Sequence, residues 1–135
     1  MSEVQLNPKY IEAVAHLVNR SPYFSLLSME IKQLHWGTCL MEVELSKKHL
    51  QPFGNVHGGA IASVLDAAAF WAVFPQVERG KGLTTVEMKL NYLVPVQRES
   101  LWLKGDVSNS GGRWLWERLL SQTVKGPLLP LEQLQ

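Results

Sequence analysis

The sequence has a single cysteine, no run of basic residues and no apolar stretch long enough to span a membrane. One thiol, Cys39, cannot form a disulfide within the chain, so the fold needs no oxidising compartment. The first ten residues lack the charged-then-apolar order of a signal peptide, and the longest apolar stretch, 60–74, is interrupted by Ser63 and Asp66. We therefore expect a cytoplasmic protein with no membrane partner.

Neither sign of charge is in excess, because 13 basic and 12 acidic side chains give a formal net charge of +1. Nucleic-acid affinity depends on clustered Lys and Arg, so we expect no nucleic-acid partner. At 135 residues the chain has the profile of one globular domain, with little room for a fully enclosed substrate cavity. We expect a single domain over 1–135, with a helical lead-in over 1–24 and an irregular tail over 126–135.

The pattern near the N-terminus predicts a helix followed by two strands. Asn7 and Pro8 form a helix start signal before apolar positions spaced by about 3.6 residues, and Pro22 ends this helix. Apolar and polar residues then alternate in 29–46, which predicts two strands joined near Gly37.

The middle of the chain predicts a central helix and three further strands. Segment 60–74 is long, rich in alanine and apolar at almost every position, so we expect a helix buried nearly all round. Segment 85–92 has the clearest alternation in the sequence, and 101–107 and 114–120 predict two more strands. The order of elements predicts an α+β fold in which an antiparallel sheet wraps around a long central helix, with a short N-terminal helix.

Asp66 is the most informative residue, because it lies within the apolar helix. An ionised carboxylate is costly in such a segment unless it has a bonded partner or a chemical task. One interpretation is a structural carboxylate, bonded to a backbone amide or to Ser63 one turn back. The other interpretation is a catalytic acid or base, and the two stay open on these residues alone.

His57-Gly58-Gly59 stands at the start of the same helix, where the first amides have no intrahelical partner and the helix dipole is positive. Glycines at this point let a substrate oxygen approach the backbone, so the amides can polarise a carbonyl and stabilise an oxyanion. The alternative interpretation is a tight turn that only begins the helix. Asn55, just before it, is predicted to cap the helix or to touch substrate.

The joint pattern of HGG, six intervening residues and Asp66 resembles hotdog-fold acyl-CoA thioesterases, in particular the phenylacetate-pathway (PaaI-like) type. The stretch TTVEMKLNYLVPV, 84–96, is similar to the strand and proline turn that follow the helix in that family. The resemblance covers roughly residues 25–123. It implies hydrolysis of an acyl-CoA substrate to a carboxylic acid and free CoA, with no cofactor apart from the CoA of the substrate.

The same resemblance assigns roles to single residues. Asp66 acts as general base or as nucleophile, and the Gly58 amide polarises the thioester carbonyl. Gln51 stands where relatives often carry an Asn, and Thr85 matches a Ser or Thr that some relatives place near the nucleophilic water. The remaining candidate substrate contacts are Asn55, His57, Gly59 and, near the CoA phosphates, Arg113. An ordinary solvent-facing side chain is the alternative for Thr85 and for Arg113.

The distance between Gly58 and Asp66 predicts more than one chain in the site. Eight residues of helix span about 12 Å, so one helix cannot easily offer both groups to one small carbonyl. Two antiparallel helices related by a two-fold axis could do so, and the resemblance implies such an interface. We therefore expect a homodimer or a homotetramer.

No metal site is predicted, because the remaining histidines lack metal-ligand spacing.

Two other functions stay open. Hotdog hydratases and dehydratases also pair a histidine with a carboxylate, so His57 and Asp66 could act on a carbon–carbon double bond. A non-catalytic hotdog protein that binds acyl-CoA is the other alternative. Gln51 in the usual Asn position and the short tail both keep it open.

Overall fold

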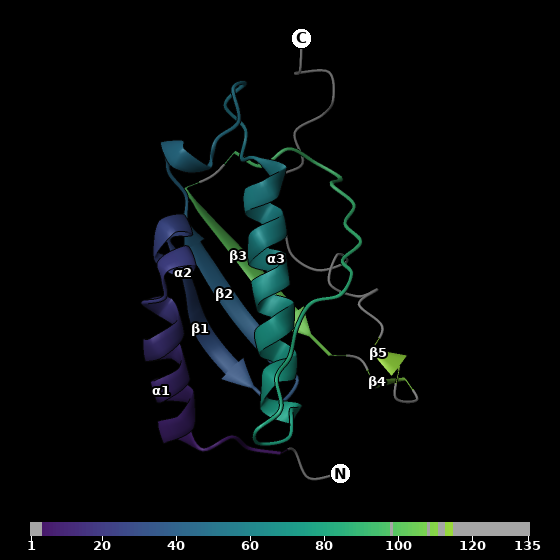
Figure 1. The fold of residues 1–135 in the computed structure, drawn as a ribbon. Helices are drawn as coiled ribbons and strands as arrows, with labels where there is room; N and C mark the ends of the chain where they lie inside the picture. Colours follow the sequence, from purple (N-terminus) through teal and green to yellow (C-terminus); the bar gives the residue numbers. More distant parts are fainter. Residues whose placement is uncertain (1–3, 98, 108, 111–112, 115–135) are drawn as a thin grey trace.

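The computed structural model describes residues 4–97, 99–107, 109–110 and 113–114 (Figure 1). In chain order the elements are α1 (Pro8–Asn19), α2 (Pro22–Leu27), β1 (Met29–His35), β2 (Thr38–Glu44), the 3-10 turn η1 (Lys47–His49), α3 (Gly58–Val73), the 3-10 turn η2 (Phe74–Gln76), β3 (Ser100–Asp106), β4 (Asn109–Ser110) and β5 (Arg113–Trp114).

The N-terminal helix begins as the sequence predicts. The Asn7 side chain accepts a hydrogen bond from the Lys9 N–H at 3.0 Å, and Pro8 occupies the first helical position of α1. Pro22 ends α1 but also begins α2, a short helix that the sequence pattern did not reveal. Ser28 closes α2 in the left-handed conformation (φ 53°) and directs the chain into β1.

The first two predicted strands are confirmed as the antiparallel hairpin of β1 and β2, with Gly37 (φ 82°) in the turn. β3 pairs antiparallel with β2, which gives the sheet order β1-β2-β3. One face of this sheet is apolar and packs against α3, and its buried side chains are Met29, Ile31, Leu34, Cys39, Met41, Val43, Leu101 and Leu103.

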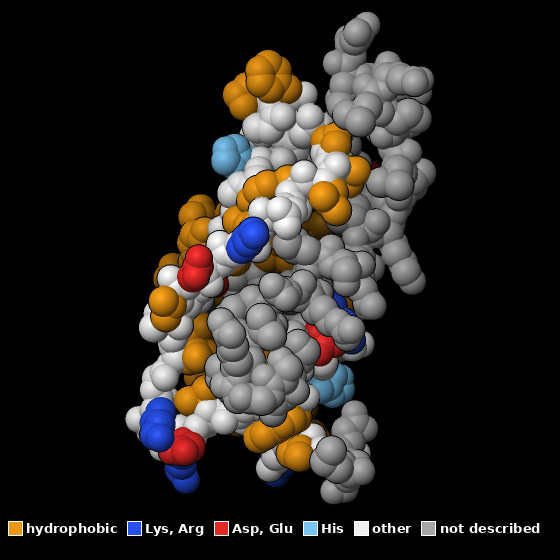
Figure 2. Space-filling model, turned by 90° about the vertical axis from the view of Figure 1, so that its right-hand side faces the viewer, with side chains coloured by type: hydrophobic (Ala, Val, Ile, Leu, Met, Phe, Trp, Pro, Cys, Tyr) orange, Lys and Arg blue, Asp and Glu red, His pale blue; other side chains and the backbone are white. Residues whose placement is uncertain are grey.

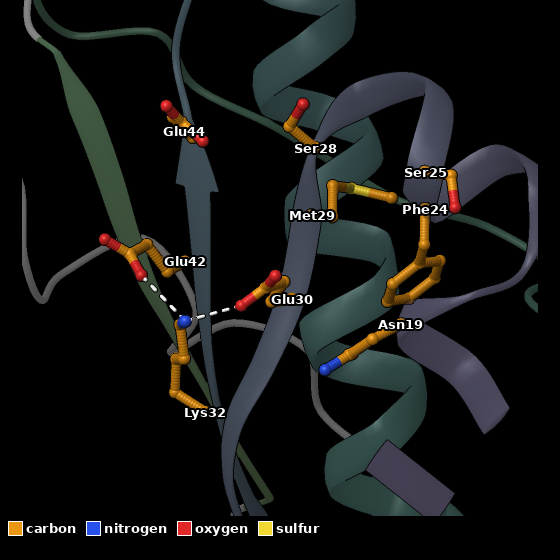
Figure 3. Close-up of a pocket in the computed structure, with 9 residues that line it drawn as sticks. All are labelled: Asn19, Phe24, Ser25, Ser28, Met29, Glu30, Lys32, Glu42 and Glu44. Carbon is orange, nitrogen blue, oxygen red and sulfur yellow. Dashed lines mark hydrogen bonds and ion pairs between the residues drawn. The ribbon is translucent and has the colours of Figure 1, made fainter. Parts of the chain in front are cut away.

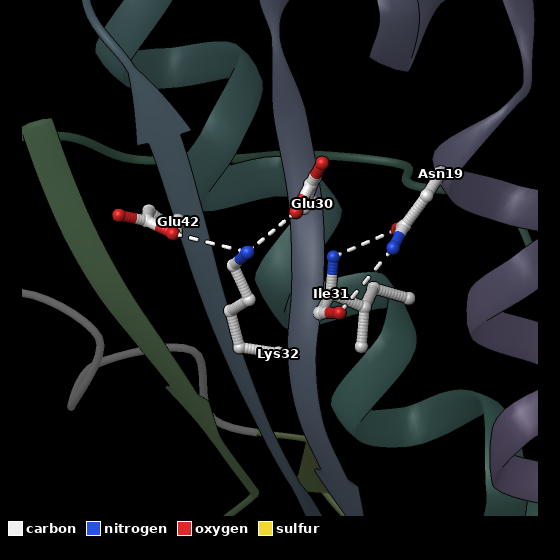
Figure 4. Close-up of polar contacts among 5 residues, drawn as sticks. All are labelled: Asn19, Glu30, Ile31, Lys32 and Glu42. Carbon is white, nitrogen blue, oxygen red and sulfur yellow. Dashed lines mark hydrogen bonds and ion pairs between the residues drawn. The ribbon is translucent and has the colours of Figure 1, made fainter.

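The free edge of β1 is covered by a side chain of α1 (Figure 4). The Asn19 side chain accepts a hydrogen bond from the Ile31 N–H at 2.8 Å and donates one to the Ile31 carbonyl at 3.4 Å. Asn19 thus takes the place of a neighbouring strand at this edge. On the polar face of the sheet, hydrogen bonds from Lys32 to Glu30 and Glu42 raise the pKa of the lysine.

The central helix α3 lies across the apolar face of the sheet, but the expectation that it is buried nearly all round is wrong. Its buried side chains lie towards the strands, whereas Ser63, Asp66 and Phe70 are half-buried. The three strands of this sheet cover only one side of α3, and burial of the other side would need further strands. Within the described chain, Gly58–Gln76 is also long and apolar enough to cross a membrane, yet its contacts with the strands are those of a core helix.

The strand predicted over 85–92 is also wrong, because residues 81–93 form neither helix nor strand. This segment returns alongside α3, from its C-terminal end towards its N-terminal end (Figure 1). Alternation specifies two faces, but a strand also needs a partner for its backbone. The strand predicted over 101–107 is confirmed as β3, and that over 114–120 lies outside the described residues apart from Trp114.

Candidate functional site

The N-terminus of α3 leaves one backbone donor exposed to the site. His57 caps the helix: its Nδ1 accepts the Gly59 N–H at 2.8 Å, and its carbonyl accepts the amides of Ala60 and Ile61 at 2.9 and 3.4 Å. Within the described residues, the Gly58 N–H has no hydrogen-bond partner. The first N–H groups of a helix have no partner within the helix. Among them, the Gly58 N–H therefore stays free to bind a ligand oxygen.

A side chain at position 58 would crowd Tyr92. A Cβ atom added there would lie 3.2 Å from the ring of Tyr92, and the Tyr92 hydroxyl donates a hydrogen bond to the Gly58 carbonyl at 3.0 Å. The sequence reasoning missed Tyr92, since the alternation of 85–92 assigned it only to an apolar face. Its contact depends on the path of the chain beside α3, for which the sequence carries no local signal.

Asp66 and Thr85 meet on the outer side of α3. The Thr85 hydroxyl donates a hydrogen bond to Asp66 Oδ1 at 2.7 Å. A hydrogen bond to a carboxylate contributes about 1.5–3 kcal/mol, reduced here because Thr85 is exposed. The sequence proposed these two residues for one site, and the fold brings them into direct contact, with one carboxylate oxygen held in place.

A small hollow adjoins this pair. It encloses about 20 Å³ and is lined by Leu65, Asp66, Ala69, Thr85, Glu87, Met88, Lys89 and Leu90. This volume is enough for a single water molecule and far too small for an acyl chain. The described chain therefore provides a place for water beside the carboxylate, whereas a pocket for a whole substrate needs further surface.

Two predicted residues lie close to the start of α3 but have other tasks. The Gln51 side-chain carbonyl accepts the Phe53 N–H within its own loop. The prediction that Asn55 caps the helix is wrong, because α3 begins at Gly58 and the cap position is therefore His57. The Asn55 carbonyl oxygen instead accepts a hydrogen bond from the Gln97 amide at 2.6 Å. Neither Gln51 nor Asn55 lines the hollow beside Asp66.

Two other residues considered from the sequence, Arg113 and Cys39, are not seen in this site. Arg113 pairs through its backbone with Ser110 in the β4–β5 hairpin, and its side chain lies outside the described part of the structure. Cys39 is buried in the core, as its strand pattern predicts, and burial raises the pKa of its thiol to about 12. Such a thiol cannot serve as a nucleophile.

A larger cavity of about 450 Å³ lies beside β1 and the α1–α2 region (Figure 3). Three of its polar lining residues are acidic, Glu30, Glu42 and Glu44, and the Lys32 amine binds the first two. It contains none of the residues that the sequence proposed for the site. The two cavities are therefore separate, and only the small one carries the predicted carboxylate.

Comparisons with known proteins agree with this fold. Residues 53–115 match the family described as the thioesterase superfamily. A thioesterase family protein of Silicibacter pomeroyi has a similar structure, with a TM-score of 0.68, 28% identity and coverage of 74% of each chain. The PaaI protein of the E. coli phenylacetic acid degradation operon superposes with a TM-score of 0.64 at 18% identity, over 75% of this chain and 72% of its own. A Saccharolobus solfataricus protein that carries an esterase name is 25% identical over 103 residues, 76% of this chain and 68% of that protein. The α+β prediction is confirmed as the hotdog fold that these structures share.

Proposed function

We propose that this chain is an acyl-CoA thioesterase of the superfamily whose model its residues 53–115 match, and that it releases a carboxylic acid and free CoA. The observation that carries the proposal is the pair of Asp66 and Thr85, a carboxylate held beside a hollow the size of one water molecule. The Gly58 N–H supplies the second element that the reaction needs, a backbone donor at a helix N-terminus.

The chemistry follows from these groups. Asp66 takes a proton from water while the water oxygen attacks the thioester carbonyl carbon, and negative charge develops on the carbonyl oxygen. The Gly58 N–H donates to that oxygen. When the carbonyl re-forms, the C–S bond breaks and the CoA thiolate leaves, taking up the proton. In the other route, a carboxylate oxygen of Asp66 attacks first, and water then hydrolyses the mixed anhydride.

Two copies of the chain complete the proposed site. Gly58 and Asp66 lie on one helix eight positions apart, about 12 Å along the axis. A second chain across a two-fold axis can place its Asp66 opposite this Gly58. We therefore propose a homodimer or homotetramer. The cytoplasm stays the proposed location, and CoA enters only as part of the substrate.

The acyl group proposed first is aromatic or of medium length. Phe70, Trp71 and Phe74 form a cluster at the C-terminal end of α3, with ring centroids 4.8–5.8 Å apart. All three side chains are half-buried. Trp71 packs against the core, and Phe70 and Phe74 remain available to line a shared pocket. The likeness to PaaI supports the same choice.

The test is a thiol-release assay over a panel of aromatic and aliphatic acyl-CoA thioesters. We expect release with at least one of them, and a loss of 10²-fold or more in kcat for Asp66→Asn, because a general base contributes about that much. Asp106→Asn is the matched control, since Asp106 is an exposed carboxylate at the end of β3. Hydrolysis by Asp66→Asn at the wild-type rate would exclude this mechanism.

The two alternatives differ in their products. A hydratase would add water to a crotonyl-type thioester without releasing CoA, but the His57 Nδ1 is already bound to the Gly59 N–H, which disfavours the histidine as a catalytic partner for Asp66. A binding protein would retain acyl-CoA without turnover. The engagement of Gln51 in its own loop favours that second candidate, and binding without thiol release across the panel would establish it.

A further inference from the structure

One polar side chain is buried in the described chain, and the proposed reaction does not use it. His49 is 2% exposed, and among the described residues it is the only buried residue that is polar or charged. The other histidines, His16, His35 and His57, are exposed, and histidine side chains appear in pale blue on the face shown in Figure 2. Burial of a polar ring costs free energy unless its nitrogens are bonded, so the surroundings of His49 have to supply partners.

Both ring nitrogens of His49 are bonded to backbone groups. Nδ1 accepts a hydrogen bond from the Ser46 N–H at 2.9 Å, and Nε2 lies 2.7 Å from the Leu27 carbonyl oxygen. Because an N–H can only donate and a carbonyl can only accept, the ring is neutral and carries its proton on Nε2. The ring therefore joins η1 to the C-terminal end of α2 and is held in one orientation.

The backbone of the same residue holds the start of α3. The His49 carbonyl accepts the His57 N–H at 2.7 Å. Leu50 and Val56 form a bridge inside this contact, so 49–57 is a short antiparallel loop. η1 lies at the same end of the fold as the N-terminus of α3 (Figure 1). One backbone hydrogen bond thus connects the residue with the buried ring to the residue that caps the helix.

The direction of the Gly58 N–H depends on His57. The two residues share a peptide plane, in which the Gly58 N–H points away from the His57 carbonyl. That carbonyl accepts the Ala60 N–H at 2.9 Å, and the His57 ring accepts the Gly59 N–H at 2.8 Å. The His57 N–H is bound to His49 on the other side. Because all three groups are bound, the peptide plane is fixed, and with it the direction of the Gly58 donor.

We propose that His49 is a positioning residue for the Gly58 N–H. Its ring fixes η1 against α2, and its carbonyl fixes the backbone of His57. This inference rests on the proposed function, because the direction of the Gly58 donor matters only if a carbonyl oxygen reacts there. A displacement of about 1 Å can cost about 10²-fold in rate. Since the donor acts on charge that develops in the transition state, its displacement lowers kcat more than it changes KM.

Three substitutions separate the two hydrogen bonds of the ring. His49→Phe keeps an aromatic ring but leaves the Ser46 N–H and the Leu27 carbonyl without their partner. His49→Asn retains an acceptor near the position of Nδ1, and His49→Gln retains a donor near that of Nε2. We expect His49→Phe to lower kcat about tenfold or more while KM changes by about twofold at most. The Asn and Gln variants should have intermediate kcat values, and they provide the comparison if His49→Phe does not fold.

Lys48→Met and Val18→Ala are the controls. The exposed Lys48 amine donates to the Ser28 hydroxyl at 2.8 Å, so it links the same two segments at the surface, and its loss should leave kcat unchanged. Val18 is buried in α1, which packs on β1, so Val18→Ala lowers stability at a place remote from the loop 49–57. If Val18→Ala lowers kcat as much as His49→Phe does, or if His49→Phe keeps the wild-type kcat, the proposal is overturned.

NMR spectroscopy of the folded protein tests the positioning without any activity assay. The nitrogen signals of the His49 ring should be those of a neutral ring protonated on Nε2. The amide signal of Gly58 should shift in His49→Phe and stay in place in Lys48→Met. A proton on Nδ1, or a Gly58 signal that is the same in His49→Phe and the wild type, would refute the proposal. A Gly58 signal that shifts in a protein that releases no thiol supports the positioning and contradicts only the proposed function.

Discussion

The side chains of Thr85 and Asp66 meet at 2.7 Å, although 19 positions separate them in the chain. The contact arises because the chain turns after η2 and returns alongside α3. It fixes one carboxylate oxygen, Oδ1. The structural interpretation of Asp66 and the catalytic one are therefore compatible, since the same hydrogen bond stabilises the carboxylate and orients it.

Removal of the Thr85 hydroxyl should lower turnover. We expect Thr85→Ala to reduce kcat about tenfold with little change in KM, because about 1.4 kcal/mol of positioning corresponds to that factor. Thr85→Ser should retain most of the activity, since it keeps the donor. Thr84→Ala is the matched control, because Thr84 is exposed and makes no side-chain hydrogen bond within the described residues. Equal losses in Thr84→Ala and Thr85→Ala would contradict a specific role.

Gly105 should be indispensable for the packing of α3 on the sheet. A Cβ atom at this position of β3 would lie 2.2 Å from the Ala68 carbonyl oxygen and 2.5 Å from its carbon. Both belong to helix backbone, so strand and helix must separate, and we expect Gly105→Ala to lower the free energy of unfolding by about 3 kcal/mol.

The control for that experiment is Gly82→Ala. A Cβ at Gly82 meets nothing within 4 Å. We expect this variant to stay within about 0.5 kcal/mol of the wild type in urea unfolding. Similar unfolding curves for the two variants would show that α3 does not approach β3 as closely as the structure indicates.

The buried thiol predicts a specific loss of stability in alkali. Burial raises the pKa of Cys39 from 9.0 to about 12. Across that interval the unfolded chain loses a proton that the folded chain keeps, so the free energy of unfolding falls as pH rises, by about 1.4 kcal/mol per pH unit. The loss of stability is absent at pH values below the lower pKa and complete at pH values above the upper pKa.

Cys39→Ala supplies the reference for this effect, because it removes the titrating group and leaves the other alkaline groups in place. As pH rises between the two pKa values, the unfolding free energy of the wild type should fall relative to that of Cys39→Ala. In the native wild type, the thiol should also resist alkylation until the protein unfolds. A pH-independent difference together with rapid alkylation would show that Cys39 is accessible.

Local features of the fold follow closely from the sequence. The cap of α1 by Asn7, the hairpin about Gly37 and the length of α3 each depend on residues near one another in the chain. The helix cap of α3 shows where such reasoning fails. Asn55 is the better capping residue by type, but the helix begins three positions later and His57 takes the task.

The candidate site also combines features that the sequence determines with contacts that only the tertiary structure decides. Sequence spacing alone establishes that Gly58 and Asp66 share a helix and lie about 12 Å apart. The contacts of Thr85 with Asp66 and of Tyr92 with Gly58 join residues far apart in the chain, so they depend on the path that the chain takes after α3. No local pattern encodes that path.

Residues 85–92 show the division most clearly. Their alternation is a property of the sequence and establishes which side chains can share a face. Whether they form a strand depends on backbone hydrogen bonds to a neighbour, and the three-stranded sheet of the described chain provides none for them. The candidate groups Gly58 and Asp66 were thus identified from residue types and spacing, whereas their contacts with Tyr92 and Thr85 were decided by the tertiary structure, because pairing and close approach are properties of two segments at once.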